Sequence, residues 1–283
     1  MVNLLLSLNN FDENWCYSIL KNIIKDNHNV LIIPFSYDDN WLKDKNDWNR
    51  AFSSEYGTHY KDIVSPFLSY GINENNIKWI NQFVDSIDLM KLKIRNSDIL
   101  FFTGGDQLRI TSILGGTPIN EAIKNLCKSK ASIVGTSAGA SVMSDTMIIE
   151  GKDDETPRKC TLKMSPGLGL VKNIMIDQHF AQRGRVGRLL TGIAQNPEVL
   201  GIGIDEDTAI IVSDEGIAEV VGSGAVYFVD GSSIQYSNVS EQYSNEVLSM
   251  FNVKLHVLKE GNKFNLLKKA PLEEDKNFYE NDK

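Results

Sequence analysis

The sequence predicts an α/β fold with a mainly parallel central sheet flanked by helices, and with antiparallel strands added in the C-terminal part. Short apolar runs alternate with helix-periodic segments from the N-terminus to about residue 195. One run, residues 131–135, passes through a glycine-flanked serine into a second run of small residues, as a strand, a tight turn and a helix would. From residue 199 the chain changes to short β-branched runs separated by turn residues.

The elements of the predicted parallel part follow one another in regular alternation. Residues 2–8 predict the first strand, and Asp12 can cap a helix that extends to about residue 25. Residues 36–59 are polar and aromatic, which indicates a loop with an amphipathic helix. The remaining strands are predicted at residues 30–33, 77–80, 98–102, 131–135 and 174–177, and the remaining helices at 60–68, 83–92, 108–114, 119–127 and 183–193.

The C-terminal part predicts an antiparallel extension of the same sheet. Its short strands fall at residues 201–212, 216–221, 225–229 and 254–258. The polar end of the chain, from about residue 270 to 283, is predicted to fray. Because no internal repeat or linker interrupts the pattern, residues 1–283 are predicted to form a single domain.

Composition excludes several classes of protein. The 283 residues carry a formal net charge of −8, which argues against a general nucleic-acid binder because such proteins need a basic face. Three cysteines (Cys16, Cys127 and Cys160) give neither a disulfide framework nor a zinc motif, and we expect no metal and no other cofactor. The N-terminal run is too short for a signal peptide, and no run is long enough to span a membrane. We therefore expect a cytoplasmic protein that does not bind membranes.

The sequence around Ser137 predicts a nucleophile. Residues 135–139 match Gly-x-Ser-x-Gly, in which the serine occupies a strained strand-to-helix turn and its hydroxyl reaches solvent. The backbone N–H of Ala138, at the start of the helix, can then stabilise an oxyanion. Taken alone, the pattern also fits a turn of small residues with a capping serine.

A diglycine predicts the second oxyanion donor. Gly104 and Gly105 follow the apolar strand at 98–102, where backbone N–H groups can approach a ligand closely. A plain turn is the alternative interpretation. With Ser137 on a neighbouring strand end, we expect Gly105 to complete the oxyanion hole.

His179 is the candidate general base, because it follows the strand at 174–177 and so lies at the sheet edge expected for Ser137. The other histidines, which have no such setting, are expected to be structural; they are His28, His59 and His256. Three arginines come next in an otherwise acidic chain, and they indicate either surface charge on a helix or a clamp for an anion; they are Arg183, Arg185 and Arg188.

Together these motifs resemble the dipeptidase E family of serine peptidases, and within it the cyanophycinases. The resemblance is carried by residues 102–110, 135–140, 177–188 and 203–209, and it is close from about residue 98 to 230. It implies a class I glutamine amidotransferase-like fold, a Ser–Glu–His triad and a homodimer. The first ninety or so residues depart from it, since residues 7–13 stand where the family usually has a Gly-Gly-Ala-Glu-Asp-like loop.

By position, the resemblance makes Ser137 the nucleophile, His179 the base and Glu155 the acid. Glu150, Asp153 and Asp154 crowd the same loop and compete with Glu155 on proximity alone. The implied substrate contacts are Gln107, Asp177, Gln178, Arg183, Arg185 and Arg188.

The implied activity is hydrolysis of β-aspartyl linkages through an acyl-enzyme. The substrate would be cyanophycin, an arginine-bearing polyaspartate, and the product β-Asp-Arg. A dipeptidase E-like enzyme for short aspartyl peptides is the alternative. An amidotransferase is disfavoured because its nucleophile is a cysteine and Ser137 stands here. The non-enzymatic alternative is a binding protein that has a hydrolase fold but no catalytic activity. Such a protein is expected to have lost a member of the triad.

Overall fold

The computed structural model describes residues 3–7, 24–37, 40, 42–128, 131–240 and 245–272, with the backbone alone for 3–7. Within these residues the chain forms two main sheets and two small hairpins. The helix predicted to begin at Asp12 lies almost wholly outside the described residues, as do residues 273–283 of the predicted tail.

The larger sheet has nine strands in the described part of the chain, in the order β17-β16-β11-β10-β1-β5-β4-β2-β3. One half is parallel and holds β1 (Asn3–Ser7), β2 (Val30–Ile33), β3 (Ile77–Trp79), β4 (Ile99–Phe102) and β5 (Ser132–Thr136). Beyond β1 the sheet continues antiparallel with β10 (Thr208–Val212), β11 (Ile217–Gly222), β16 (Lys263–Asn265) and β17 (Ala270–Pro271). The predicted fold class is confirmed. β17 pairs with β16 at the point where the predicted tail begins.

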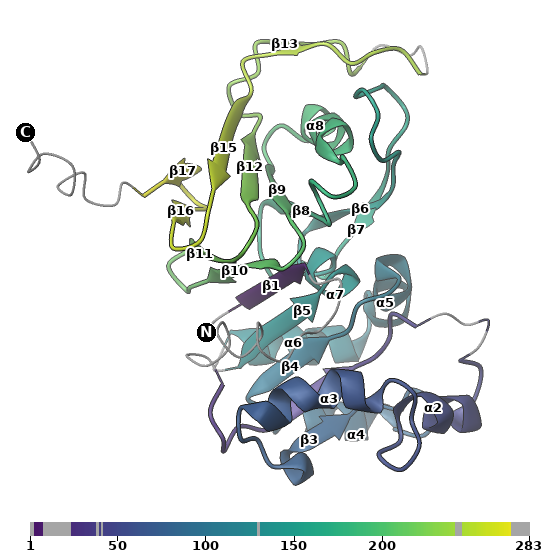
Figure 1. Cartoon of the computed structure of the whole chain (residues 1–283). Helices are drawn as coiled ribbons and strands as arrows, with labels where there is room; N and C mark the ends of the chain where they lie inside the picture. Colours follow the sequence, from purple (N-terminus) through teal and green to yellow (C-terminus); the bar gives the residue numbers. More distant parts are fainter. Residues whose placement is uncertain are drawn as a thin grey trace, which may run out of the picture.

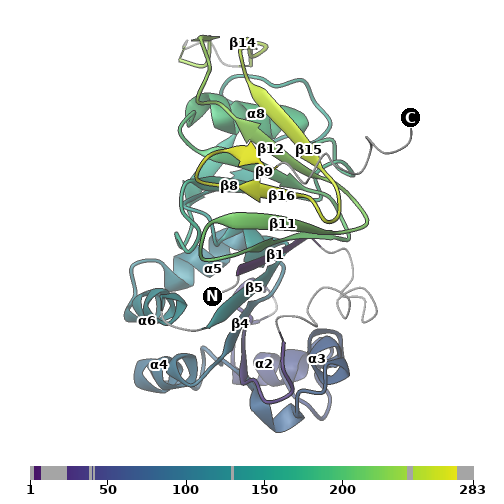
Figure 2. The ribbon, with the colours of Figure 1, turned by 90° about the vertical axis from the view of Figure 1, so that its left-hand side faces the viewer.

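Helices cover both faces of the parallel half (Figure 2). One face carries α2 (Lys45–Phe52) and α3 (Tyr60–Ser69), and the other carries α4 (Ile87–Arg95), α5 (Gln107–Leu114) and α6 (Pro118–Cys127). A short 3-10 helix, Glu74–Asn76, precedes β3. Side chains alternate along β2, with Ile32 in the core under α2 and α3 and Ile33 in the core on the other face. A strand buried on both faces is apolar throughout, as these runs are.

A second sheet, in the order β15-β12-β9-β8, stands above the first (Figure 1). It comprises β8 (Ile174–Gln178), β9 (Leu200–Ile204), β12 (Val226–Asp230) and β15 (Lys254–Leu258), with α8 (Val186–Gln195) packed against it. The predicted single extended sheet is therefore right for β10 and β11 and wrong for β9, β12 and β15. The reason is that β9 pairs in parallel with β8. The glycines of β9 leave room for the side chains packed on it, since a Cβ on Gly203 would lie 2.5 Å from the Phe180 ring.

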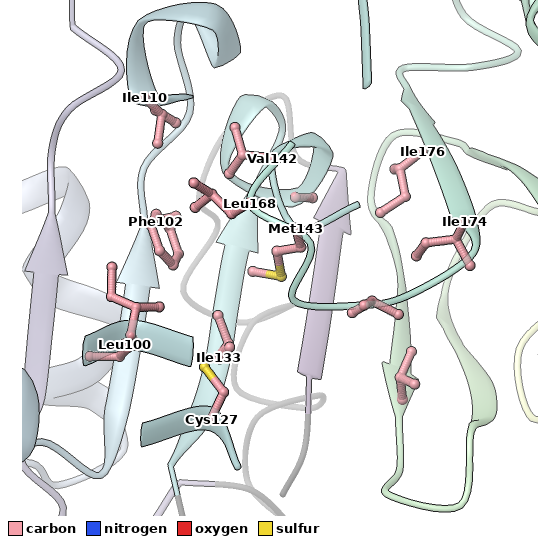
Figure 3. Close-up of a cluster of buried hydrophobic side chains, with 14 of the residues drawn as sticks. Leu100, Phe102, Ile110, Cys127, Ile133, Val142, Met143, Leu168, Ile174 and Ile176 are labelled. Atoms are coloured by element: carbon pink, nitrogen blue, oxygen red, sulfur yellow. The ribbon is translucent and has the colours of Figure 1, made fainter. Parts of the chain in front are cut away.

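Two pairs of short strands and one apolar cluster complete the fold. β6 (Thr146–Glu150) pairs with β7 (Lys163–Pro166), and β13 (Tyr236–Ser237) pairs with β14 (Met250–Phe251). Figure 3 shows Met143 and Leu168 between Phe102 of β4 and Ile176 of β8. Met143 lies just after α7 (Ala138–Ser141), so this cluster fixes the turn at Ser137 against both sheets.

Candidate active site

Ser137 occupies a strained turn between β5 and α7. Its φ is 49° and its ψ is −113°, a backbone conformation that L-residues rarely adopt. The flanking glycines make this turn possible, because a Cβ on Gly135 would lie 2.2 Å from the Gly139 carbonyl oxygen and a Cβ on Gly139 2.2 Å from that of Phe102. Strain of this kind concentrates at functional sites. The geometry is that of a nucleophile turn rather than a plain capping serine.

His179 comes from the other sheet and meets Ser137. It directly follows β8, also has a positive φ of 51°, and places its Nε2 atom 3.1 Å from Ser137 Oγ. The next residue, Phe180, is buried under β9 and holds this part of the chain in place. The distance is within reach of a proton transfer from the hydroxyl to the imidazole.

The carboxylate beside His179 belongs to Glu206. Its Oε1 atom lies 2.9 Å from His179 Nδ1, and both side chains are largely buried. Glu206 follows β9, the parallel neighbour of β8, and the register pairs Gln178 with Ile204 at the ends of these strands. Asp205, which is buried, accepts hydrogen bonds from the backbone N–H groups of Ala181 and Ala225 and thereby fixes the loop that carries Glu206.

The prediction that Glu155 bonds to His179 is wrong. Its carboxylate is exposed and pairs with Lys152 at 3.0 Å, on a loop that packs against the start of α8. The signal for Glu206 was present in the sequence, since it lies within the run at residues 203–209 and follows a buried strand. The role of Glu206 could be recognised only with the knowledge that β8 and β9 are adjacent. The carboxyl ends of parallel neighbouring strands lie at the same edge of a sheet, so residues that follow these two strands meet there.

The diglycine loop lies beside the nucleophile. A Cβ on Gly104 would come within 3.5 Å of the Ser137 Cβ, and Gly105 has a φ of 141° that favours glycine. Ser36 ties this loop to the end of β2: its hydroxyl donates to the Gly104 carbonyl at 2.5 Å, and its carbonyl accepts from Asp106 N–H at 2.8 Å. Gly105 and Ala138 line the same hollow as Ser137.

Two hollows meet at Ser137 and His179. The first, of about 380 Å³, is polar and is bordered by the predicted substrate residues Gln107, Asp177, Gln178, Arg183, Arg185 and Arg188. The second, of about 370 Å³, extends toward α3 and shares Gly105, Ser137, His179 and Arg183 with the first. A substrate that spans the nucleophile can therefore place groups on both sides of it.

Two of the three predicted clamp arginines are engaged within the protein. Arg188 donates two hydrogen bonds to the buried Asp177 carboxylate, one from Nε at 2.6 Å and one from Nη2. Arg185 donates to the backbone carbonyl of Gln178 at 2.6 Å. Both also bond to Asp153, at 2.9 Å from Arg185 Nε and 3.1 Å from Arg188 Nη1. Two arginines and two aspartates form a neutral network, so Arg185, Arg188 and Asp177 frame the hollow rather than offering free charges.

Arg183 and Gln178 are two polar groups of the first hollow that remain available to a ligand. Arg183 is exposed, lines both hollows and forms no ion pair with an acid of the described residues. Gln178 is 3% exposed, and neither of its amide atoms has a hydrogen-bond partner within the described chain. A buried amide without partners is costly unless a ligand or water satisfies it. Gln107, in contrast, donates to the Ile148 carbonyl at 2.9 Å.

Burial lowers the pKa of the His179 imidazole below its ordinary value, and the charge of Arg183 lowers it further, whereas the hydrogen bond to Glu206 opposes the shift. The net effect keeps the imidazole neutral at neutral pH. Neutral imidazole is the form that can accept the Ser137 proton.

A pH prediction follows from this balance. The acidic limb of kcat/KM should lie below the ordinary histidine pKa of about 6.5. Arg183→Gln removes a cation that disfavours the imidazolium, so the His179 pKa should rise and the limb should move to higher pH. Arg183→Lys keeps the charge and should leave the limb in place. Identical limbs in the wild type and in Arg183→Gln would contradict this account of the shift.

A serine on a strained strand-to-helix turn, bonded to a histidine that is bonded in turn to a carboxylate, is the arrangement of serine hydrolases. The family model described as "Peptidase family S51" matches residues 50–220, more than half of the chain, and the chain belongs to this family. The family resemblance predicted from the sequence is confirmed.

The comparisons with individual proteins agree with this membership. The chain is 41% identical over 174 residues to a cyanophycinase of Trichormus variabilis, covering 61% of this chain and 58% of that protein. It is 35% identical over 212 residues to a cyanophycinase of Synechococcus elongatus, covering 74% and 65%. The chain thus matches less than two thirds of the length of these curated relatives. A solved peptidase from an acI-B1 Actinobacterium shares the fold, with a TM-score of 0.60 at 17% identity over 93% of this chain and 96% of that one.

Proposed function

We propose that the protein is a serine peptidase that degrades cyanophycin, an arginine-bearing polyaspartate, to β-Asp-Arg dipeptides. The observation that supports the proposal is a pair of hydrogen bonds that link Ser137 to His179 and His179 to Glu206. The serine of this triad lies on a strained turn. Membership of peptidase family S51 and the identity to cyanophycinases support the substrate.

The proposed product determines which bond is cut. A β-Asp-Arg dipeptide still contains the amide between the aspartate side chain and arginine. Its release therefore requires cleavage of the main-chain amides that join successive aspartates. The β-aspartyl bond, whose cleavage the sequence interpretation proposed, stays intact in the product, and attack on that side-chain amide would release free arginine instead.

The reaction then proceeds as acyl transfer to water. His179 Nε2 takes the Ser137 proton as Oγ attacks the main-chain carbonyl carbon of an aspartate, and the same proton passes to the departing amine. Water, deprotonated by His179, then hydrolyses the ester and restores the serine. Glu206 holds the imidazole through Nδ1 and stabilises its charge. The N–H groups of Ala138 and Gly105 bind the oxyanion, each contributing about 3 kcal/mol by analogy with other oxyanion donors.

The first hollow provides substrate contacts beside this machinery. Arg183 binds a carboxylate of the substrate, and the buried amide of Gln178 gains the hydrogen bonds that the protein does not supply. Asp177, Arg185 and Arg188 act on the substrate through the shape that their network gives the hollow.

A peptidase for short aspartyl peptides is the second candidate, because the divergent N-terminal half borders the second hollow and can limit the length of the substrate. No helix among the described residues combines the length and apolar character that a bilayer crossing needs. A homodimer and a cytoplasmic location remain predictions.

The proposal is tested by mass spectrometry of the products that the purified protein forms from insoluble cyanophycin and from short aspartyl peptides. β-Asp-Arg should accumulate from the polymer. Free arginine as the main product would show that the side-chain amide is cut. Cleavage of short peptides with an untouched polymer would favour the second candidate.

A further inference from the structure

The second hollow carries charges of both signs on its walls. Asp62, in the first turn of α3, and Arg183, after β8, both line it, together with the reacting residues Ser137 and His179. No ion pair joins Asp62 to a lysine or arginine in the part of the chain that the structure describes. Asp177, the acid of the first hollow, is in contrast neutralised by Arg185 and Arg188. Asp62 is thus the acid of the two hollows that remains available to a cationic ligand.

The surroundings of Asp62 suit a planar cation. Tyr37 lines the same hollow, and its ring is held by edge contact with Phe52 at 4.9 Å and by His59 at 5.0 Å between ring centroids. Ile63 and Phe101 supply an apolar wall. A guanidinium group combines stacking on an aromatic ring with a forked pair of hydrogen bonds to a carboxylate, whereas an ammonium group makes a point contact only.

We propose that the second hollow binds the arginine unit of the substrate, with Asp62 taking the guanidinium and Arg183 the carboxylate. In β-Asp-Arg the arginine is attached through its amine, so its carboxylate is free and the unit carries one charge of each sign. Opposite charges on the walls of one hollow complement such a unit. Asp62 is then a specificity-determining residue, contributed by a helix of the N-terminal half. This inference rests on the proposed function, because the arginine belongs to the substrate proposed above.

The test uses the intact protein and two matched oligomers of aspartate, one bearing arginine and one bearing citrulline, which has a similar shape and no charge. The wild type should prefer the arginine oligomer in kcat/KM by roughly three- to tenfold, as a charge-assisted hydrogen bond to an exposed carboxylate predicts. Asp62→Asn should bring this ratio close to one, mainly through a higher KM for the arginine oligomer. Asp62→Glu should retain part of the preference.

Asp88→Asn is the matched control. Asp88 has the same charge, its side chain is 94% exposed, and it lies on α4 at the other face of the sheet. Its replacement should leave the arginine-to-citrulline ratio at the wild-type value. A calorimetric measurement with the Ser137→Ala protein gives a second readout: Asp62→Asn should weaken binding of β-Asp-Arg and leave binding of β-Asp-citrulline unchanged.

The outcomes separate the two proposals. If Asp62→Asn keeps the wild-type ratio while the polymer is still degraded to β-Asp-Arg, the assignment of Asp62 is wrong and the proposed function stands. If the wild type cleaves neither oligomer nor the polymer, both proposals are wrong.

Discussion

Ser137→Ala is expected to lower kcat for β-Asp-Arg release by about 10⁴-fold or more, because serine hydrolases that lose the nucleophile keep only the contribution of the oxyanion hole and of binding. The substitution removes the hydroxyl that lies 3.1 Å from His179 Nε2 and leaves the Cβ in place. The positive φ at this position is equally strained for alanine and serine, so the folded state should be retained. The measurement is the rate of dipeptide release, with circular dichroism to check the fold.

A matched control is available on the same strand. Ser132 begins β5, five positions before Ser137, and does not line either hollow. Ser132→Ala should keep kcat within about twofold, as surface and strand substitutions away from a site generally do. If Ser137→Ala protein of proven purity releases the dipeptide at a rate within tenfold of the wild type, Ser137 is not the nucleophile.

Local patterns predicted much of the fold and the position of the nucleophile. The glycines at 135 and 139 are required by close approaches of backbone to backbone, and such requirements are visible as glycine in the sequence. The strand at 30–33 and the helix at 60–68 are confirmed to within a residue, because apolar periodicity reports burial directly. The helix predicted at 83–92 begins later, at Ile87, where the Ser86 hydroxyl caps it by accepting a hydrogen bond from Leu89 N–H.

Features that depend on contacts between distant segments could not be predicted in this way. Three nearby arginines look alike in the sequence, yet Arg188 pairs with Asp177 while Arg183 stays exposed. The difference is one of position: Arg188 lies on α8, which packs against β8, whereas Arg183 lies in the turn between β8 and α8. The division of the C-terminal strands into two sheets has the same origin, since it depends on β9 pairing with β8 rather than with β10.

Glu206→Gln is expected to lower kcat by roughly 10³–10⁴-fold, because loss of the orienting carboxylate in a serine triad has an effect of this size. Glutamine is nearly isosteric, so its side chain can occupy the same place beside His179 Nδ1. It cannot stabilise the imidazolium that forms when Ser137 attacks. It also removes the negative charge that, with its hydrogen bond, raises the His179 pKa, so the acidic limb of kcat/KM should move to lower pH while the maximal rate falls.

Glu155→Gln is the matched control, since it makes the same chemical change on the loop at residues 151–157. Glu155 is exposed and pairs with Lys152, and a surface pair of this kind contributes little. Its replacement should therefore change kcat by no more than about twofold. Glu206→Gln at the wild-type rate, combined with a large loss in Glu155→Gln, would show that the loop at residues 151–157 closes on His179 when substrate binds. A large loss in Glu206→Gln alone would establish Glu206 as the residue that orients the base. The two substitutions make the same chemical change, and of the two glutamates they replace only Glu206 contacts the imidazole.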